Sequence, residues 1–123
     1  MERVRETTSE KLFDGRLLCR QHRQGYRFSH DPVLLAHFFL PPPSEKIIDL
    51  GTGCGIIPLI LAYRRPTIAV TGLEIQPELI VLARANVVEN GMDDRLQVIE
   101  GDICRIEEHF AAASFERVVS NPP

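Results

Sequence analysis

The chain has 123 residues, of which 44% are hydrophobic and 25% are charged, with 8 glycines, 9 prolines and no tryptophan. These proportions are typical of one soluble globular domain, and they argue against a disordered, collagen-like or fibrous chain. The longest apolar run, residues 33–40, is far shorter than the roughly 20 residues that a membrane-spanning helix needs. We therefore expect neither a membrane helix nor a signal peptide.

Charge is distributed unevenly around a net value of −3. Residues 1–27 carry seven basic and four acidic side chains, whereas the remainder carries seven basic and thirteen acidic ones. A basic arm on an acidic body permits a polyanionic partner, although a solvated surface hairpin would carry the same charges. Cys19, Cys54 and Cys104 form no CxxC pair and have no histidine at metal-ligand spacing. We expect reduced thiols, no metal site and a cytoplasmic location.

The N-terminal segment predicts a β-hairpin. Asp14-Gly15 lies between apolar residues within residues 11–28. An Asp-Gly pair in this setting favours a tight hairpin turn, because its backbone readily adopts positive φ angles. We expect the second strand of this hairpin to end at residues 26–28.

A short helix is expected next. Asp31 offers an N-cap, Pro32 occupies the first helical position, and residues 33–40 supply an almost wholly apolar helix. Three prolines at residues 41–43 end it. We treat residues 1–45 as an N-terminal hairpin and helix that precede a second unit, residues 46–123.

From residue 46 onward, short apolar segments alternate with amphipathic ones. This alternation predicts an α/β fold with a parallel sheet and right-handed crossovers. Strands are expected at residues 46–50, 68–73, 96–99 and 115–119, and helices at 57–65, 76–90 and, weakly, 106–112. Because open parallel sheets normally have covered faces and protected edges, we expect residues 1–123 to be a fragment of a longer protein. Otherwise the N-terminal segment or another subunit should cover the edge of the last strand.

A glycine-rich turn follows the first of these strands. Glycines at 51, 53 and 55, with Thr52 between the first two, lie where an open α/β sheet binds its ligand, at the carboxyl ends of the strands. Glycines there let a ligand approach main-chain amides, which favours a nucleoside-bearing ligand, although tight turns need glycine in any case. The spacing differs from the G-x-G-x-x-G of dinucleotide-binding sheets. Asp49, just before the turn, would repel a pyrophosphate but would accept hydrogen bonds from the ammonium group of an amino-acid ligand.

Two more acids are expected at the ends of the next two strands. Glu74 could bind both hydroxyls of a ribose, and its plain alternative is an exposed acid at a strand end. Asp102 could accept a hydrogen bond from the exocyclic amine of an adenine, with Ile75 and Ile103 packed on the ring faces. Three acids at three successive strand ends suit a ligand that carries an amine, a ribose and an adenine. They suit a phosphate poorly.

These motifs, together with the terminal Asn121-Pro122-Pro123, resemble the class I S-adenosylmethionine-dependent methyltransferases over residues 46–123. The resemblance implies a Rossmann-like sheet, of which the chain would contain the first four parallel strands with their flanking helices. It also implies S-adenosyl-L-methionine as the cofactor. Asp49 with Gly51, Thr52, Gly53 and Gly55 would hold its methionine part, Glu74 its ribose, and Asp102 its adenine.

Asn-Pro-Pro is the candidate site for the methyl acceptor. An amide or aniline-like nitrogen is a poor nucleophile, because its lone pair is delocalised. The Asn121 side-chain oxygen and the Pro122 carbonyl could bind its N–H groups and favour pyramidalisation as attack begins. We name Asn121 and Pro122 as catalytic, and Pro123 with them as substrate-binding; a stiff polar turn is the plain alternative. In similar N-methyltransferases a Tyr or Phe follows, which this chain does not reach.

Residues 25–36, with the hairpin before them, look like the N-terminus of the bacterial enzymes that methylate N6 of an adenine beside a tRNA anticodon. That resemblance implies tRNA or another nucleic acid as the partner, contacted by the basic arm at its phosphates. It also implies that Phe28 and Asp31 border the cofactor pocket. The plain alternatives are a core aromatic for Phe28 and a helix cap for Asp31.

Other activities remain open from the sequence. A protein glutamine-N5 or rRNA guanine-N2 methyltransferase would make the same demands of Asn-Pro-Pro. More distant alternatives are a non-catalytic cofactor-binding fragment and a nicotinamide-dependent (NAD) oxidoreductase. We expect the isolated 123 residues to bind the cofactor weakly and to turn over little substrate. The sequence indicates no oligomeric state.

Overall fold

The computed structural model of the chain describes residues 6–24, 27–28 and 30–122. Tyr26, Ser29 and Pro123, which fall in segments discussed above, lie outside these residues. Ten elements follow one another along the chain: β1 (Thr7–Leu12), β2 (Leu17–His22), α1 (His30–Phe38), β3 (Lys46–Leu50), α2 (Ile56–Arg64), β4 (Ala69–Glu74), α3 (Pro77–Glu89), β5 (Leu96–Glu100), the 3-10 helix η1 (Ile103–Glu108) and β6 (Arg117–Ser120).

Strands β3 to β6 form one parallel sheet in the order β5-β4-β3-β6. The strands are short and largely apolar, as is usual where a parallel sheet is covered by helices. In register, Leu50 lies between Leu73 and Ser120, and Glu74 pairs with Glu100. All four strands therefore end at the same edge, here called the carboxyl edge. The predicted α/β fold is confirmed.

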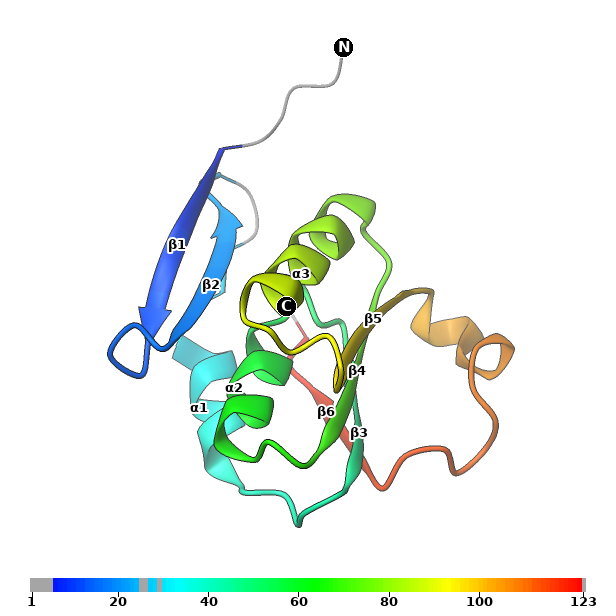
Figure 1. The fold of residues 1–123 in the computed structure, drawn as a ribbon. Coiled ribbons are helices and arrows are strands. Elements are labelled where there is room, and N and C mark those ends of the chain that lie inside the picture. The colour runs from blue at the N-terminus through cyan, green and yellow to red at the C-terminus, as the bar shows by residue number, and fades with distance from the viewer. Residues whose placement is uncertain (1–5, 25–26, 29, 123) are drawn as a thin grey trace.

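The hydrophobic core lies between this sheet and helices α2 and α3. Alternate residues of the strands point toward the helices because side chains alternate across a strand, and they form one buried cluster with α2 and α3: Ile47, Val70, Val98 and Val119. Seven of the nine residues of α2 are buried. A helix that is apolar all round must be covered on every side. Here the sheet, α1 and the hairpin surround α2 (Figure 1).

The predicted hairpin is confirmed, with one correction to its length. β1 and β2 pair antiparallel around the turn at Asp14-Gly15, where Gly15 donates its N–H to the Leu12 carbonyl at 3.1 Å. β2 ends at His22, which pairs with Thr7 at the start of β1, and so it does not reach residues 26–28. Phe28 has left the ladder, because its N–H donates to the side-chain Oε1 of Gln21 at 3.0 Å.

Three other elements have boundaries that differ by two residues or more from the sequence expectation. α1 already begins at His30, so Asp31 lies in its first turn and is not the N-cap. η1 covers Ile103–Glu108 instead of residues 106–112, because the Asp102 side chain caps it by accepting the Cys104 N–H at 2.9 Å. β6 begins at Arg117, since Phe115 leaves the strand to pack edge-on against Phe110.

The hairpin lies on the helical side of the sheet, and η1 projects on the other side (Figure 1). β2 contacts α2 and α3, and the hairpin forms a sheet of its own, so it does not cover the free edge of β6. Among the described residues, no helix combines the length and apolar character that crossing a bilayer requires.

Candidate active site

The glycine-rich turn between β3 and α2 folds back over the end of β4. The N–H groups of Gly51 and Thr52 both donate to the Leu73 carbonyl, at 2.9 and 3.0 Å. Gly53 and Gly55 have φ angles of +59° and +87°, a conformation that glycine adopts without strain. The turn therefore lies at the carboxyl edge, as the sequence analysis expects.

Asp49 is buried beneath this turn, with 1% of its surface exposed. Its Oδ2 accepts a hydrogen bond from the Thr52 hydroxyl at 2.7 Å, whereas its Oδ1 is buried and bonds to no described residue. Burial raises the pKa of the Asp49 carboxyl from 3.8 to about 7; the Thr52 hydrogen bond lowers this pKa, and the nearby Glu74 raises it further. A buried carboxylate with one unpaired oxygen is suited to a cationic hydrogen-bond donor.

Glu74 is a buried anchor of the turn and not an exposed acid at a strand end. Its Oε1 accepts the Gly53 N–H at 2.8 Å, and its Oε2 accepts the N–H groups of Ile75 and Gln76 at 3.0 and 3.1 Å. Each carboxylate oxygen offers about two acceptor positions. Oε1 therefore has room for one further donor, such as a hydroxyl, while Glu74 holds the turn against the end of β4.

Gly72 is a residue that the sequence analysis missed. It pairs in register with Asp49 on the neighbouring strand. A Cβ at this position would lie 2.7 Å from Thr52 Cγ2 and 2.8 Å from Thr52 Oγ1, so glycine lets Thr52 reach Asp49. The available signal was a lone glycine inside an apolar strand, which often marks a close approach of another group.

The β5 end of the carboxyl edge combines an acid with two exposed apolar side chains. Asp102 is half-buried, and its Oδ1 is engaged as the cap of η1. Ile75 and Ile103 are 56% and 47% exposed. Large apolar side chains left open beside a polar group are typical of ligand-binding surfaces.

Asn121 and Pro122 follow β6 directly. Ser120 pairs in register with Leu50, and its hydroxyl donates to the Leu50 carbonyl at 3.3 Å. Because Gly51 follows Leu50 and Asn121 follows Ser120, the backbone register brings Asn121 beside the start of the glycine-rich turn. Asn121 is half-buried and Pro122 is exposed. Pro123 lies outside the described residues.

Phe28 and Asp31 occupy the N-terminal part of the molecule. Phe28 is half-buried and packs against the hydrophobic core. Asp31 is exposed in the first turn of α1. The structure thus places Phe28 where a core aromatic would lie, and a border of the cofactor pocket remains a prediction for both residues.

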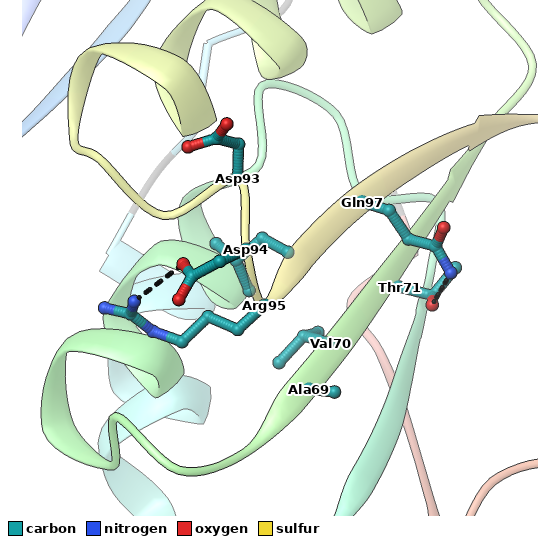
Figure 2. Close-up of a pocket in the computed structure, with 8 residues that line it drawn as sticks. Ala69, Val70, Thr71, Asp93, Asp94, Arg95 and Gln97 are labelled. Atoms are coloured by element: carbon teal, nitrogen blue, oxygen red, sulfur yellow. Dashed lines mark hydrogen bonds and ion pairs between the residues drawn. The ribbon is translucent and has the colours of Figure 1, made fainter.

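A cavity of about 200 Å³ lies at the opposite edge of the sheet, by the amino ends of β4 and β5. Two polar pairs line it (Figure 2): Asp94 forms an ion pair with Arg95 at 3.1 Å, and Gln97 donates to the Thr71 hydroxyl at 3.0 Å. The Nε of Arg95 is buried and bonds to no described residue. Neither Asp49 nor the glycine-rich turn lines this cavity. Within residues 6–24, 27–28 and 30–122, no three His, Cys, Asp or Glu side chains cluster in a way that could hold a metal ion.

Comparison with known proteins supplies the family. The model of the methyltransferase small domain matches residues 29–123, which include the entire parallel sheet. The chain belongs to the methyltransferase small domain family. This match confirms, at the level of the family, the resemblance to S-adenosylmethionine-dependent methyltransferases. The carboxyl edge described above lies within the matched residues.

Individual relatives of this methyltransferase small domain include two tRNA1(Val) (adenine(37)-N6)-methyltransferases. The protein from Vibrio campbellii is 36% identical over 100 residues, and that from Porphyromonas gingivalis is 38% identical over 103 residues. The alignments cover 80% and 79% of this chain, which spans only 40% of the length of each relative. Among solved structures, an RNA methyltransferase from Salinibacter ruber, in complex with S-adenosyl-L-homocysteine, is 25% identical with a TM-score of 0.57, over 66% of this chain and 52% of that one.

Proposed function

We propose that the protein is an S-adenosylmethionine-dependent N-methyltransferase that acts on N6 of an adenine in tRNA near the anticodon. The substrate assignment is supported by the two relatives whose names specify this reaction. The observation that carries the cofactor assignment is the unpaired, buried Oδ1 of Asp49 beside a glycine-rich turn at the carboxyl edge. An ammonium group is the donor that such an oxygen favours.

The residues at the carboxyl edge fit this cofactor part by part. S-adenosylmethionine supplies a methyl group on a positively charged sulfur, which is a reactive centre for displacement. Asp49 would accept hydrogen bonds from the amino-acid end, and the backbone of the turn, from Gly51 through Thr52 and Gly53 to Gly55, would line that end. Glu74 Oε1 has room for a ribose hydroxyl, whereas its Oε2 is already engaged.

The adenine of the cofactor would lie at the β5 end of this edge. Ile75 and Ile103 present the exposed apolar surface that a flat ring can pack against. Asp102 would accept a hydrogen bond from the exocyclic amine, through the oxygen that does not cap η1. These contacts discriminate adenine from bases that lack an amine at this position.

Asn121 and Pro122 would hold the acceptor nitrogen. Two hydrogen-bond acceptors, the Asn121 side-chain oxygen and the Pro122 carbonyl, would bind the N–H groups of the adenine amine. These bonds strengthen as the nitrogen becomes cationic, so they stabilise the transition state more than the ground state. No strong base is required, because the nitrogen loses its proton only after attack, and positioning in line with the methyl group supplies much of the rate.

A tRNA partner also fits the charge of the hairpin. Three of its arginines are engaged with acids, in the pairs Arg20–Glu89, Arg23–Glu6 and Arg27–Glu10. Lys11 and Arg16, beside the hairpin turn, form no ion pair with a described residue. Among the described residues of the hairpin, these two cations are therefore available to phosphate groups, which fix the position of an RNA without reading its sequence.

The test is a methyl-transfer assay with the full-length protein, offering unmodified tRNA, ribosomal RNA and a release-factor-like protein in parallel. We expect transfer to N6 of an adenine in tRNA. We also expect Asn121→Ala to lower kcat by about 100-fold while leaving the affinity for S-adenosylhomocysteine within about threefold. Methyl transfer only to the release-factor-like protein, or only to guanine in RNA, would contradict the proposed substrate. NADH binding without S-adenosylhomocysteine binding would overturn the cofactor proposal.

A further inference from the structure

Two asparagines, Asn86 in α3 and Asn90 as the C-cap of that helix, dock the hairpin onto the body of the protein. Asn90 accepts the Leu18 N–H at 3.0 Å and donates to the Leu18 carbonyl at 2.7 Å. One helical turn earlier, Asn86 accepts the Arg20 N–H at 2.8 Å and donates to the Arg20 carbonyl at 2.9 Å. The two amides thus satisfy the backbone groups along the outer edge of β2, which an edge strand otherwise leaves unpaired.

Asn86 differs from Asn90 in what else it holds. Its Nδ2 also donates to the carbonyl of Cys54 at 2.8 Å, and Cys54 lies inside the glycine-rich turn. The other donor of Asn90 instead returns to its own helix, at the Asn86 carbonyl, 2.7 Å away. The hairpin and the turn also touch directly. The sulfur atoms of Cys19 on β2 and of Cys54 lie 3.6 Å apart. Asn86 therefore connects the hairpin to the turn, whereas Asn90 connects it to the helix alone.

The turn is held from two sides at adjacent residues. Glu74 holds the N–H of Gly53, and Asn86 holds the carbonyl of Cys54. The flanking glycines at 53 and 55 have positive φ angles and no side chain that packs, so external hydrogen bonds must select one conformation of this segment. Asn86 is fully buried, with both amide hydrogens and the oxygen engaged. Its removal would leave buried polar groups without partners.

We propose that Asn86 is a positioning residue that sets the conformation of the glycine-rich turn for the cofactor and couples cofactor binding to docking of the N-terminal hairpin. The inference rests on the proposed function, since it takes S-adenosylmethionine as the ligand of the turn. Coupling between two sites is reciprocal. A cofactor bound to the turn therefore stabilises the docked hairpin, and a docked hairpin strengthens cofactor binding.

Asn86→Ala and Asn90→Ala form a matched pair that separates this role from simple stability. Both variants remove an amide that holds β2, and both should lower the free energy of unfolding in denaturant titrations. Only Asn86→Ala releases the Cys54 carbonyl. In calorimetric titration with S-adenosylhomocysteine, we expect Asn86→Ala to weaken binding by about tenfold or more and Asn90→Ala by less than about threefold. Equal weakening by the two variants would overturn the proposal.

Hydrogen exchange adds a measurement on the same proteins without ligand. The amides of Thr52, Gly53 and Gly55 are all hydrogen-bonded in the turn. Asn86→Ala should speed their exchange, and Asn90→Ala should leave it close to that of the wild type. This comparison of exchange rates needs no ligand. If the wild-type protein binds no S-adenosylhomocysteine, the proposed function is overturned, but the effect of Asn86 on the turn can still be measured. Unchanged exchange in Asn86→Ala would overturn the positioning role.

The wild-type protein provides the deciding measurement if Asn86→Ala does not fold. Saturation with S-adenosylhomocysteine should slow exchange of the Arg20 amide on β2, which the ligand does not touch. It should not slow exchange at Arg117, where β6 begins at the far edge of the sheet. Protection of the turn without any protection of Arg20 would contradict the coupling.

Discussion

The Asp49 carboxyl group titrates close to neutral pH, because burial raises its pKa to about 7. The folded protein therefore holds this proton more tightly than the unfolded chain, in which the carboxyl has its ordinary value near 3.8. Its contribution to the stability of the fold is complete below that ordinary value and is lost as the pH rises through about 7. Ligand binding has the opposite preference, since a cationic amine binds the ionised form.

Asp49→Asn should change the pH dependence of stability. The variant carries no titrating group at this position and does not lose this contribution, so its free energy of unfolding should increase relative to that of the wild type between about pH 5 and pH 8. Urea titrations of both proteins at the two pH values measure this difference. A difference that does not change with pH would show that Asp49 is ionised in the fold throughout this range.

The affinity for S-adenosylhomocysteine should rise with pH and level off above about 7. Below that value the ligand must displace a proton from Asp49, which costs up to about tenfold in affinity per pH unit. Calorimetry in buffers of different ionisation enthalpy detects the released proton directly. In Asp49→Asn, affinity should fall by about 10- to 100-fold at pH 8 and lose this pH dependence. An unaltered pH profile in the variant would assign the proton to another group.

Among the elements, those defined by strong apolar patterns were predictable. The β3 bounds agree with the sequence prediction, and α2 and α3 agree to within about one residue, because apolar periodicity, Pro77 and Asn90-Gly91 specify them locally. The end of β2 was not predictable, since it depends on where its partner β1 begins. The start of η1 was missed because the Asp102 cap was interpreted only as a ligand contact.

In the candidate site, the positions of the acidic residues were predictable from the sequence, but the residues that hold the surrounding segments in place were not. Asp49 and Glu74 stand at strand ends and could be found from position alone. Gly72 and Asn86 act through close contacts between segments distant in the sequence, which no local pattern reveals. Asn86 did leave one trace, because it interrupts the otherwise apolar buried face of α3. A polar residue on such a face usually has a specific partner.

Gly72→Ala tests the fit between β4 and the glycine-rich turn. The new Cβ would approach the Thr52 side chain to 2.7–2.8 Å, and overpacking of this kind costs about 1–3 kcal/mol of stability. Thermal and denaturant unfolding measure the loss. Thr52→Ser in the same chain removes the methyl group at 2.7 Å and should recover part of it. An unaffected Gly72→Ala variant would show that the turn adapts at no cost.

At the scale of the whole molecule, β2 of the hairpin adjoins the glycine-rich turn at the carboxyl edge. Helices α2 and α3 lie between the sheet and the hairpin (Figure 1). Residues 1–27 carry an excess of basic residues, while the remainder of the chain is acidic. Phe13 in the hairpin turn stacks on Tyr63 near the end of α2, away from the glycine-rich turn where α2 begins. An RNA that reaches Asn121 and also touches Lys11 or Arg16 must therefore follow the surface past the helices.

Lys11→Glu and Arg16→Glu should weaken tRNA binding by the full-length protein. Each should also reduce the slope of log affinity against log salt by about one for every phosphate that the substituted side chain no longer neutralises. Lys46→Glu, at the amino end of β3 and so at the opposite edge of the sheet, is the matched control. Fluorescence titrations at several salt concentrations give both quantities. Equal effects of all three substitutions would indicate a general charge effect and no binding of RNA at the hairpin.

A crystal structure of the protein with S-adenosylhomocysteine tests the central claim most directly. We predict that the amino group of the ligand lies within hydrogen-bonding distance of Asp49 Oδ1, its ribose at Glu74, and its adenine between Ile75 and Ile103. Density for the ligand in the cavity beside Thr71 and Arg95, or anywhere else away from the carboxyl edge, would contradict the assignment.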